Sequence, residues 1–288
     1  MPSQLNLLKN IQCDGACLLM SFTGWMDGGD VSTGTVAHLR QSLDAEPVAE
    51  IRPDDFYIMS FPGSMEVAAM FRPHLKIEDG TIQELQLPKN TFHCSAEQKL
   101  ILFEGREPNI NWPLYADCMF TLARDAGVKG IYFIGSVAGL VPHTREPRIF
   151  GSVSEARLKK PLRELGLRFT NYEGPGSFVS YLMTQAPKYQ LPMVTVVAEI
   201  PAYSQGGNPK AIHSMAKKLA ALLNIVINTD ELRTLSESWE AKLSEAVAER
   251  EELVNHVKKL EEDYDNEVFD SQMDDLKDLL HRQGIRLD

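Results

Sequence analysis

The chain has 288 residues, of which 43% are hydrophobic and 24% are charged, a composition typical of a globular protein with a sizeable core. Its net charge of −11 disfavours nucleic acid and anionic membranes as partners. No apolar run approaches the roughly 20 residues that a membrane-spanning helix needs. The first ten residues lack the apolar region of a signal peptide, so we expect a cytoplasmic location.

Strand-like and helix-like patterns alternate up to residue 228, which predicts an α/β domain over residues 1–230. We predict a mostly parallel sheet with helices on both faces, because several strands are apolar on both sides. Strands are predicted at residues 17–22, 55–61, 99–105, 130–136, 167–172, 193–200 and 224–228, with a hairpin around Pro88–Asn90. Helices are predicted at residues 31–43, 112–126, 154–165, 177–189 and 209–223.

Residues 231–288 differ in composition from the rest of the chain and carry a net charge of −9. Apolar residues recur mainly at spacings of three and four, which predicts an acidic amphipathic helical tail. The apolar stripe slips by a residue or two around residues 249–252, and the acidic stretch 261–270 is expected to break the helix. A last helix is expected at residues 271–283, with an apolar face formed by Met273, Leu276, Leu279 and Leu280.

The glycine-rich turn "FTGWMDGGDVSTG" (22–34) stands between a predicted strand and a predicted helix, a common place for phosphate. However, it matches neither standard phosphate-binding glycine pattern. Asp30 is expected to cap the helix, and Asp27 adds a second negative charge, so we expect carboxylates rather than phosphate at these amides. Trp25 fits equally well as a lid over the core or as an interface anchor.

Further polar residues follow other predicted strands, where α/β proteins gather their ligands. His143 and Arg145 suit acid–base chemistry and anion binding, or belong to a loop stiffened by its prolines. Asn111 and Ser177 are expected to cap helices, and the nucleophile-elbow pattern is absent, so no catalytic residue is assigned. The predicted pocket comprises Asp27, Arg106, Glu107, His143, Arg145, Glu173, Glu199 and Tyr203.

The four cysteines are Cys13, Cys17, Cys94 and Cys118. They form no C-x-x-C pair and show neither metal-ligand nor disulfide spacing. We therefore expect small core residues, no metal site and no cofactor.

Five stretches occur in the same order as in the proteasome assembly chaperone family: "GWMDGGDVSTGTVAHL", "GREPNINW", "GLVPHTREP", "YEGPGS" and "NPKA". From about residue 15 to about residue 265 the chain resembles the branch of the second chaperone, in particular its prokaryotic members. The resemblance implies a three-layer α/β/α domain of the phosphorylase/hydrolase-like kind, followed by a helical C-terminal segment. It also implies self-association into homo-oligomers, with a trimer favoured, and the handling of proteasome-like subunits.

Two functions and, as a third interpretation, a purely structural oligomer are open at this stage. One is a non-enzymatic, chaperone-like protein that acts by protein–protein binding. The alternative is a phosphorylase- or hydrolase-like enzyme for a nucleoside-like or amide substrate, in which Arg106 and Arg145 bind an anion and His143 or Glu173 serves as acid or base. Trp25, Trp112 and Trp239 are the candidate interface residues of an oligomer.

Overall fold

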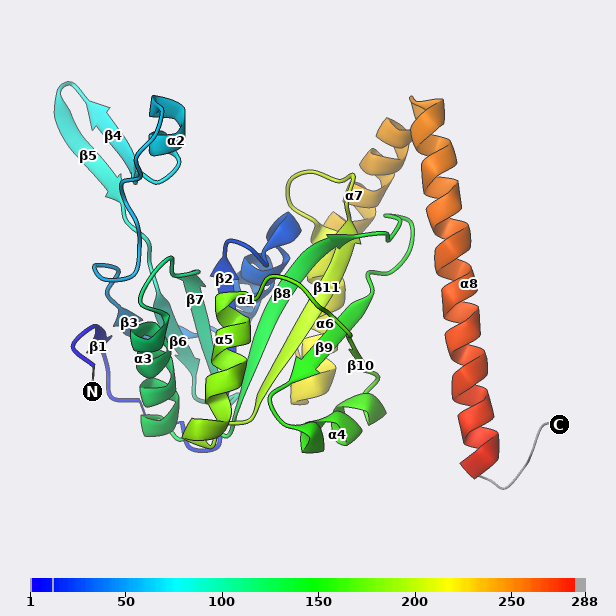
Figure 1. Ribbon diagram of the computed structural model, residues 1–288, viewed down its shortest axis with the longest axis horizontal. Coiled ribbons are helices and arrows are strands. Elements are labelled where there is room, and N and C mark those ends of the chain that lie inside the picture. The colour runs from blue at the N-terminus through cyan, green and yellow to red at the C-terminus, as the bar shows by residue number, and fades with distance from the viewer. Residues whose placement is uncertain (1, 12, 283–288) are drawn as a thin grey trace.

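The computed structural model describes residues 2–11 and 13–282 of the chain (Figure 1). Within them, nine strands form one sheet in the order β1-β3-β6-β7-β2-β8-β11-β9-β10. These strands are β1 (Leu5–Leu7), β2 (Cys17–Thr23), β3 (Glu46–Ile51), β6 (Thr91–Ser95), β7 (Leu100–Arg106), β8 (Gly130–Gly139), β9 (Ile149–Val153), β10 (Arg168–Phe169) and β11 (Met193–Pro201). A separate ribbon pairs β4 (His74–Glu78) with β5 (Thr81–Gln86).

The helices alternate with these strands along the chain. They are α1 (Val31–Ser42), α2 (Met65–Ala69), α3 (Trp112–Asp125), α4 (Lys159–Glu164), α5 (Phe178–Gln185), α6 (Pro209–Leu223), α7 (Asp230–Ala248) and α8 (Glu251–Arg282). Short 3-10 turns are η1 (Gly28–Asp30), η2 (Ala156–Leu158) and η3 (Ala186–Tyr189).

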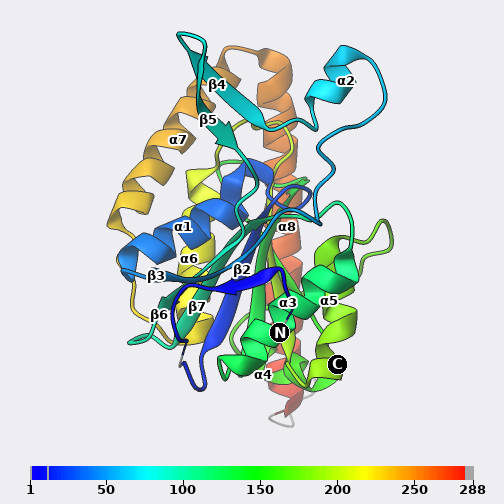
Figure 2. The ribbon, with the colours of Figure 1, turned by 90° about the vertical axis from the view of Figure 1, so that its left-hand side faces the viewer.

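The four central strands, β7, β2, β8 and β11, are parallel to one another. Antiparallel strands flank them, with β6, β3 and β1 on one side and β9 on the other. Successive side chains of β2 point to opposite faces: Met20 and Phe22 join the core that includes α3 and α5, and Leu19 joins the core that includes α1 and α6. Helices therefore cover both faces (Figures 1 and 2), and the predicted α/β fold with a C-terminal helical segment is confirmed.

Two predicted strands are wrong. Residues 55–61 form no strand; Phe56 and Tyr57 are apolar in pattern because they are buried beside the sheet. Residues 224–228 form no strand, and Ile225 and Ile227 pack against the core that includes α1 and α6. In both segments, side chains that are buried without any strand pairing produced an apolar pattern like that of a strand.

The predicted hairpin turn at Pro88–Asn90 is also wrong. The β4–β5 hairpin turns at Asp79 and Gly80, which both have positive φ (46° and 72°). An Asp-Gly pair is a favoured two-residue hairpin turn. The segment after it continues into β6, which pairs with β3 and β7 rather than with β5. The strands β1, β3, β4 and β9 were not predicted from the sequence.

The tail forms two helices, and the predicted break within residues 261–270 is wrong. The helices α7 and α8 meet at Glu249 and Arg250, where the apolar stripe slips, and α8 runs unbroken through the acidic stretch. The predicted separate helix at 271–283 is part of α8 up to Arg282; residue 283 and the side chains of Leu276, Leu279 and Leu280 lie outside the described residues. The division of the chain into domains at residue 230 stays a prediction.

Candidate functional site

The turn after β2 is closed by Asp27 rather than by Asp30. Asp27 accepts hydrogen bonds from the backbone N–H of Thr33 (3.1 Å) and from its hydroxyl (2.8 Å), at the start of α1. Burial raises the pKa of Asp27, and these two bonds oppose that rise. Asp30 makes no capping bond with its side chain and has a left-handed backbone (φ 55°), so the predicted cap at Asp30 is wrong.

This turn also lies against the start of α6. The backbone N–H of Asn208 donates to the carbonyl of Gly29 (2.8 Å), and a Cβ added at Gly29 would lie 2.9 Å from the Cβ of Asn208. Asn208 caps α6 by accepting from the N–H of Ala211 (3.0 Å). The glycines therefore allow close packing of two chain segments here.

Glu107, after β7, connects two neighbouring elements. One carboxylate oxygen accepts from the N–H of Phe178 (2.9 Å), and the other accepts from the N–H of Trp25 (3.3 Å). Ser177 caps α5 as predicted, through the N–H of Ser180 (3.2 Å). Asn111 occupies the cap position of α3, but its side chain donates to the carbonyl of Asp55 (2.7 Å) and does not cap the helix.

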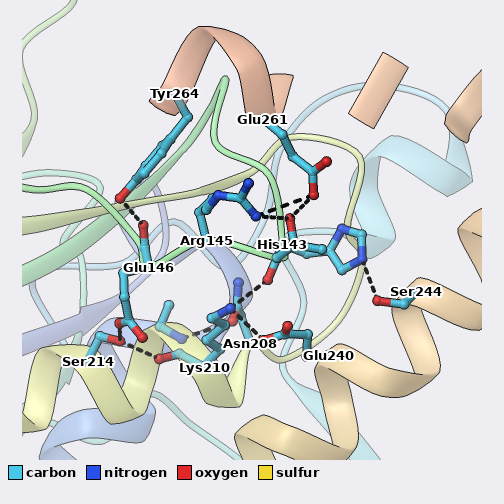
Figure 3. A network of polar contacts seen from close by, with 12 residues as sticks. His143, Arg145, Glu146, Asn208, Lys210, Ser214, Glu240, Ser244, Glu261 and Tyr264 are labelled. Carbon is cyan, nitrogen blue, oxygen red and sulfur yellow. Dashed lines mark hydrogen bonds and ion pairs between the residues drawn. The ribbon is translucent and has the colours of Figure 1, made fainter. Parts of the chain in front are cut away.

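The loop after β8, residues 140–148, meets α6, α7 and α8 in a polar network (Figure 3). His143 is buried, and its Nδ1 lies 2.7 Å from the Tyr203 hydroxyl, while its Nε2 lies 3.0 Å from the Ser244 hydroxyl of α7. Burial lowers the pKa of His143. Lys210 of α6 donates to the carbonyl of His143 (2.8 Å) and to the carboxylate of Glu240 on α7 (2.5 Å).

Acidic residues of α8 neutralise the cations of the same loop. Arg145 makes two bonds of 2.8 Å to the carboxylate of Asp265, and Glu261 accepts from the Thr144 hydroxyl. Tyr264 donates its hydroxyl to the carbonyl of Glu146 (3.0 Å), as Figure 3 shows. The acidic tail is therefore docked onto the loop that the sequence marked as a candidate site.

The docked tail leaves little space beside His143. The cavity bounded by His143, Arg145, Glu199 and Trp239 has a volume of about 10 Å³. A single water molecule needs about 10–15 Å³. An acid or base must lie within hydrogen-bond reach of a substrate, and this cavity has no room for one.

The eight residues of the predicted pocket do not form one constellation. His143, Arg145 and Glu199 line the small cavity, and Tyr203 contacts His143. Asp27 and Glu107 hold the turn after β2 and its neighbours. Arg106 and Glu173 are exposed, and in the described chain neither makes a hydrogen bond or ion pair with the others; the Arg106 guanidinium lies 5.9 Å from the ring of Tyr57.

The tail contributes residues to this network that the sequence did not single out. Glu240, Ser244, Glu261 and Asp265 were seen only as parts of an acidic helical face. The signal was available in the charges, because an acidic tail and a loop with two arginines are complementary.

The three tryptophans lie in different environments. Trp25 is 65% exposed. Trp112 packs against Phe178 and Tyr181, with ring centroids 5.6 and 5.9 Å away, and its indole N–H donates to the carbonyl of Pro108 (2.9 Å). Trp239 lines the cavity beside His143. An interface role for these residues stays a prediction.

A second candidate surface is the arm, which we define as residues 61–87. It holds α2, β4 and β5 and projects beyond the sheet (Figures 1 and 2). In the ribbon, Leu75 faces Leu85 and Ile77 faces Ile82, so one face is apolar. These four side chains are exposed, as are five others of the arm: Phe61, Met65, Val67, Met70 and Leu87. Exposed apolar surface of this kind is typical of protein, membrane or ligand interaction sites, and a two-stranded ribbon is only marginally stable alone.

Metal-ion sites and membrane-spanning helices are both absent from the described residues. No group of three or more His, Cys, Asp or Glu side chains there is arranged to hold a metal ion. No helix in that part of the chain is both long and apolar enough to cross a membrane. All four cysteines are free; Cys13 and Cys118 are buried, and Cys17 and Cys94 are half-buried.

Solved structures of three bacterial proteins share this fold. A proteasome-assembly chaperone homologue of Mycobacterium tuberculosis is 28% identical, with a TM-score of 0.72 over 84% of this chain and 99% of that one. A PAC2 family protein from Streptomyces avermitilis is 25% identical, with a TM-score of 0.70 over the same shares. A Mycobacterium tuberculosis protein of unknown function is 22% identical, with a TM-score of 0.80 over 96% of this chain and 93% of that one.

No curated protein matches the chain. The model of the PAC2 family matches residues 21–247, which include the sheet core, the loop after β8 and α7. The resemblance found in the sequence motifs is confirmed: the chain belongs to the PAC2 family.

Proposed function

We propose that this protein is a non-enzymatic, proteasome-assembly-chaperone-like protein that acts by binding other proteins, and that the arm is its main binding surface. The exposed apolar face of the arm carries this proposal. Membership of the PAC2 family and the likeness to a proteasome-assembly chaperone homologue support the choice of partner. The partners are other copies of this chain, with a trimer favoured, and proteasome-like subunits; the location is cytoplasmic.

The face of the ribbon opposite the apolar one provides a matched control. Lys76 lies opposite Glu84 in the strand register on that face, whereas Ile77 and Ile82 are 55% and 64% exposed on the apolar face. Replacing exposed side chains changes folding stability little, usually by less than about 0.5 kcal/mol. Variants of either face should therefore fold, and only the apolar-face variant should lose binding.

The experiment compares Ile77→Lys/Ile82→Lys with Lys76→Gln/Glu84→Gln in the full chain. Light scattering gives the oligomer mass, and co-purification with recombinant proteasome-type α and β subunits of the source organism measures partner capture. We expect the apolar-face variant to lose one or both, with the control unchanged. Equal mass and equal capture for both variants and the native chain would refute the arm as the binding surface.

The alternative, a phosphorylase- or hydrolase-like enzyme, gains no support from the geometry. Its four residues are divided between the docked loop after β8, which holds His143 and Arg145, and the exposed positions Arg106 and Glu173. Chemistry would require these groups to meet around a substrate.

A further inference from the structure

A cavity of about 240 Å³ lies between the edge of the sheet and α8. Phe150 of β9, Arg168 of β10, Lys218 of α6 and Tyr264 of α8 contribute to its lining, together with Arg148. The volume is far above the roughly 10–15 Å³ that one water molecule needs. It is below the roughly 300–1,000 Å³ of pockets for drug-sized ligands, so it suits a small polyatomic ligand.

Three cations line this cavity in a chain whose net charge is −11. The Arg148 side chain is only 13% exposed, and its guanidinium lies 4.7 Å from the ring centroid of Tyr264. The fork of an Arg side chain matches the oxygens of phosphate and carboxylate groups. The combination therefore favours an anionic ligand.

Lys218 has the least compensated charge of the three. Its ammonium donates to the carbonyls of Leu165 (3.1 Å) and Gly166 (2.8 Å), and within the described chain it forms no ion pair with a carboxylate. Gly166 lets it approach, because a Cβ there would lie 3.3 Å from Nζ. Burial lowers the pKa of Lys218, as expected of an ammonium that lacks a full hydration shell and a counter-ion. An ammonium has three N–H donors, so one is left for a ligand.

Two carboxylates already reach this group of cations, and one of them comes from the tail. Glu267 of α8 lies 2.6 Å from Arg148 and 4.0 Å from Arg168, and its side chain is 50% exposed. The second carboxylate on Arg148 is Glu199, at 3.2 Å. The Glu267 carboxylate is half exposed and carries a single charge, so it loses less on returning to water than a buried partner would, and a dianion with twice its charge can replace it.

We infer that this cavity is a binding site for a small phosphate-type dianion, held by Arg148, Arg168 and Lys218, and that Glu267 is the internal carboxylate that the dianion displaces. The site is separate from the arm, so the protein-binding role does not depend on it.

The test titrates the full chain with inorganic phosphate at constant ionic strength, by calorimetry and by ³¹P NMR, and repeats the titration with glycerol 3-phosphate. We expect saturable binding with a Kd of about 1 mM or lower. Tighter binding of glycerol 3-phosphate would identify the ligand as a phosphomonoester, and equal or weaker binding would identify it as free phosphate. Lys218→Met should bind about tenfold more weakly, because a charged hydrogen-bond donor is lost, whereas the exposed neighbour variant Lys217→Met should bind like the native chain.

A second pair of variants does not depend on preserved folding. Glu267→Gln removes the competing carboxylate and should tighten phosphate binding several-fold, a gain that misfolding cannot produce. Glu262→Gln, at an exposed position of the same helix, is the matched control. Absence of saturation in both the native chain and Glu267→Gln, or equal affinity for Lys218→Met and the native chain, would overturn the inference.

Discussion

The contact between Lys210 of α6 and Glu240 of α7 joins the C-terminal helices to the rest of the fold and allows a quantitative test of how the tail is held. The Lys210 side chain is 10% exposed and that of Glu240 is 36% exposed, with 2.5 Å between their charged atoms. Removing one partner of a buried pair costs about 3–5 kcal/mol, and an exposed pair contributes about 0–1 kcal/mol. For this intermediate burial we expect Glu240→Ala to lower the free energy of unfolding by about 2 kcal/mol.

A double-mutant cycle separates the pair from the rest of each side chain. Lys210→Met removes the ammonium, which also bonds the carbonyl of His143, and keeps the length of the side chain. In the cycle with Glu240→Ala we expect a coupling energy of about 1–2 kcal/mol. The reason is that once one charge of the pair has been removed, removing the other lowers the free energy of unfolding by only a little more. Urea unfolding followed by circular dichroism gives each value, and the single Glu240→Ala change should lower Tm by roughly 4–8 °C.

Arg233 of α7 provides the control. It pairs with Asp230 at 3.2 Å on the same helix, but the two side chains are 61% and 79% exposed. Arg233→Ala should therefore cost no more than about 0.5 kcal/mol. If Glu240→Ala costs no more than Arg233→Ala, or if the coupling energy is below about 0.3 kcal/mol, the tail is not held by this contact.

Three other changes test the packing and the charges. Burial lowers the pKa of His93 from 6.5 to about 4, with a smaller contribution from the charge of Arg40. As the pH falls from 6.5 to 4, His93 therefore takes up a proton more readily in the unfolded chain than in the folded one. The unfolding free energy should fall by about 2 kcal/mol between pH 6.5 and pH 4, and His93→Gln should lack this part of the fall in urea titrations at each pH. Trp112→Ala should cost about 3 kcal/mol in urea unfolding because its ring is packed between helices, whereas Trp25→Ala should cost less than about 0.5 kcal/mol; equal costs would contradict these environments. Ser177→Ala should cost about 1 kcal/mol and Ser177→Thr much less, and a neutral Ala variant would show that the cap is not needed.

Sequence patterns predicted correctly those helices that are determined by interactions between residues near one another in the chain. The helices at 31–43, 112–126 and 209–223 agree with α1, α3 and α6 to within one residue at each end, because the apolar period acts over one or two turns; a proline also marks the starts of α3 and α6. Asp30 failed as a cap because the turn inserts η1, which places Asp27 within reach of Thr33. The choice between two nearby carboxylates depends on backbone angles that the residue types alone do not determine.

The candidate site was predictable as a set of loops but not as a set of contacts. The strand ends brought His143 and Tyr203 together, as expected for parallel strands. Arg145 was expected in a pocket and instead pairs with Asp265, 120 residues further along the chain. Such pairing is non-local, and a single sequence records only that opposite charges exist.

The sequence by itself determined the α/β class, the family and the helical, acidic nature of the tail, because these follow from apolar periodicity, composition and ordered motifs. The tertiary structure alone decided that the tail docks on the loop after β8, that the β4–β5 ribbon leaves its apolar face exposed, and that Glu267 reaches the cations beside Lys218. The physical reason is that each of these features depends on which surfaces, distant in the sequence, come into contact. The free energy of burial and of ion pairing is set by those contacts and not by the neighbouring residues in the chain.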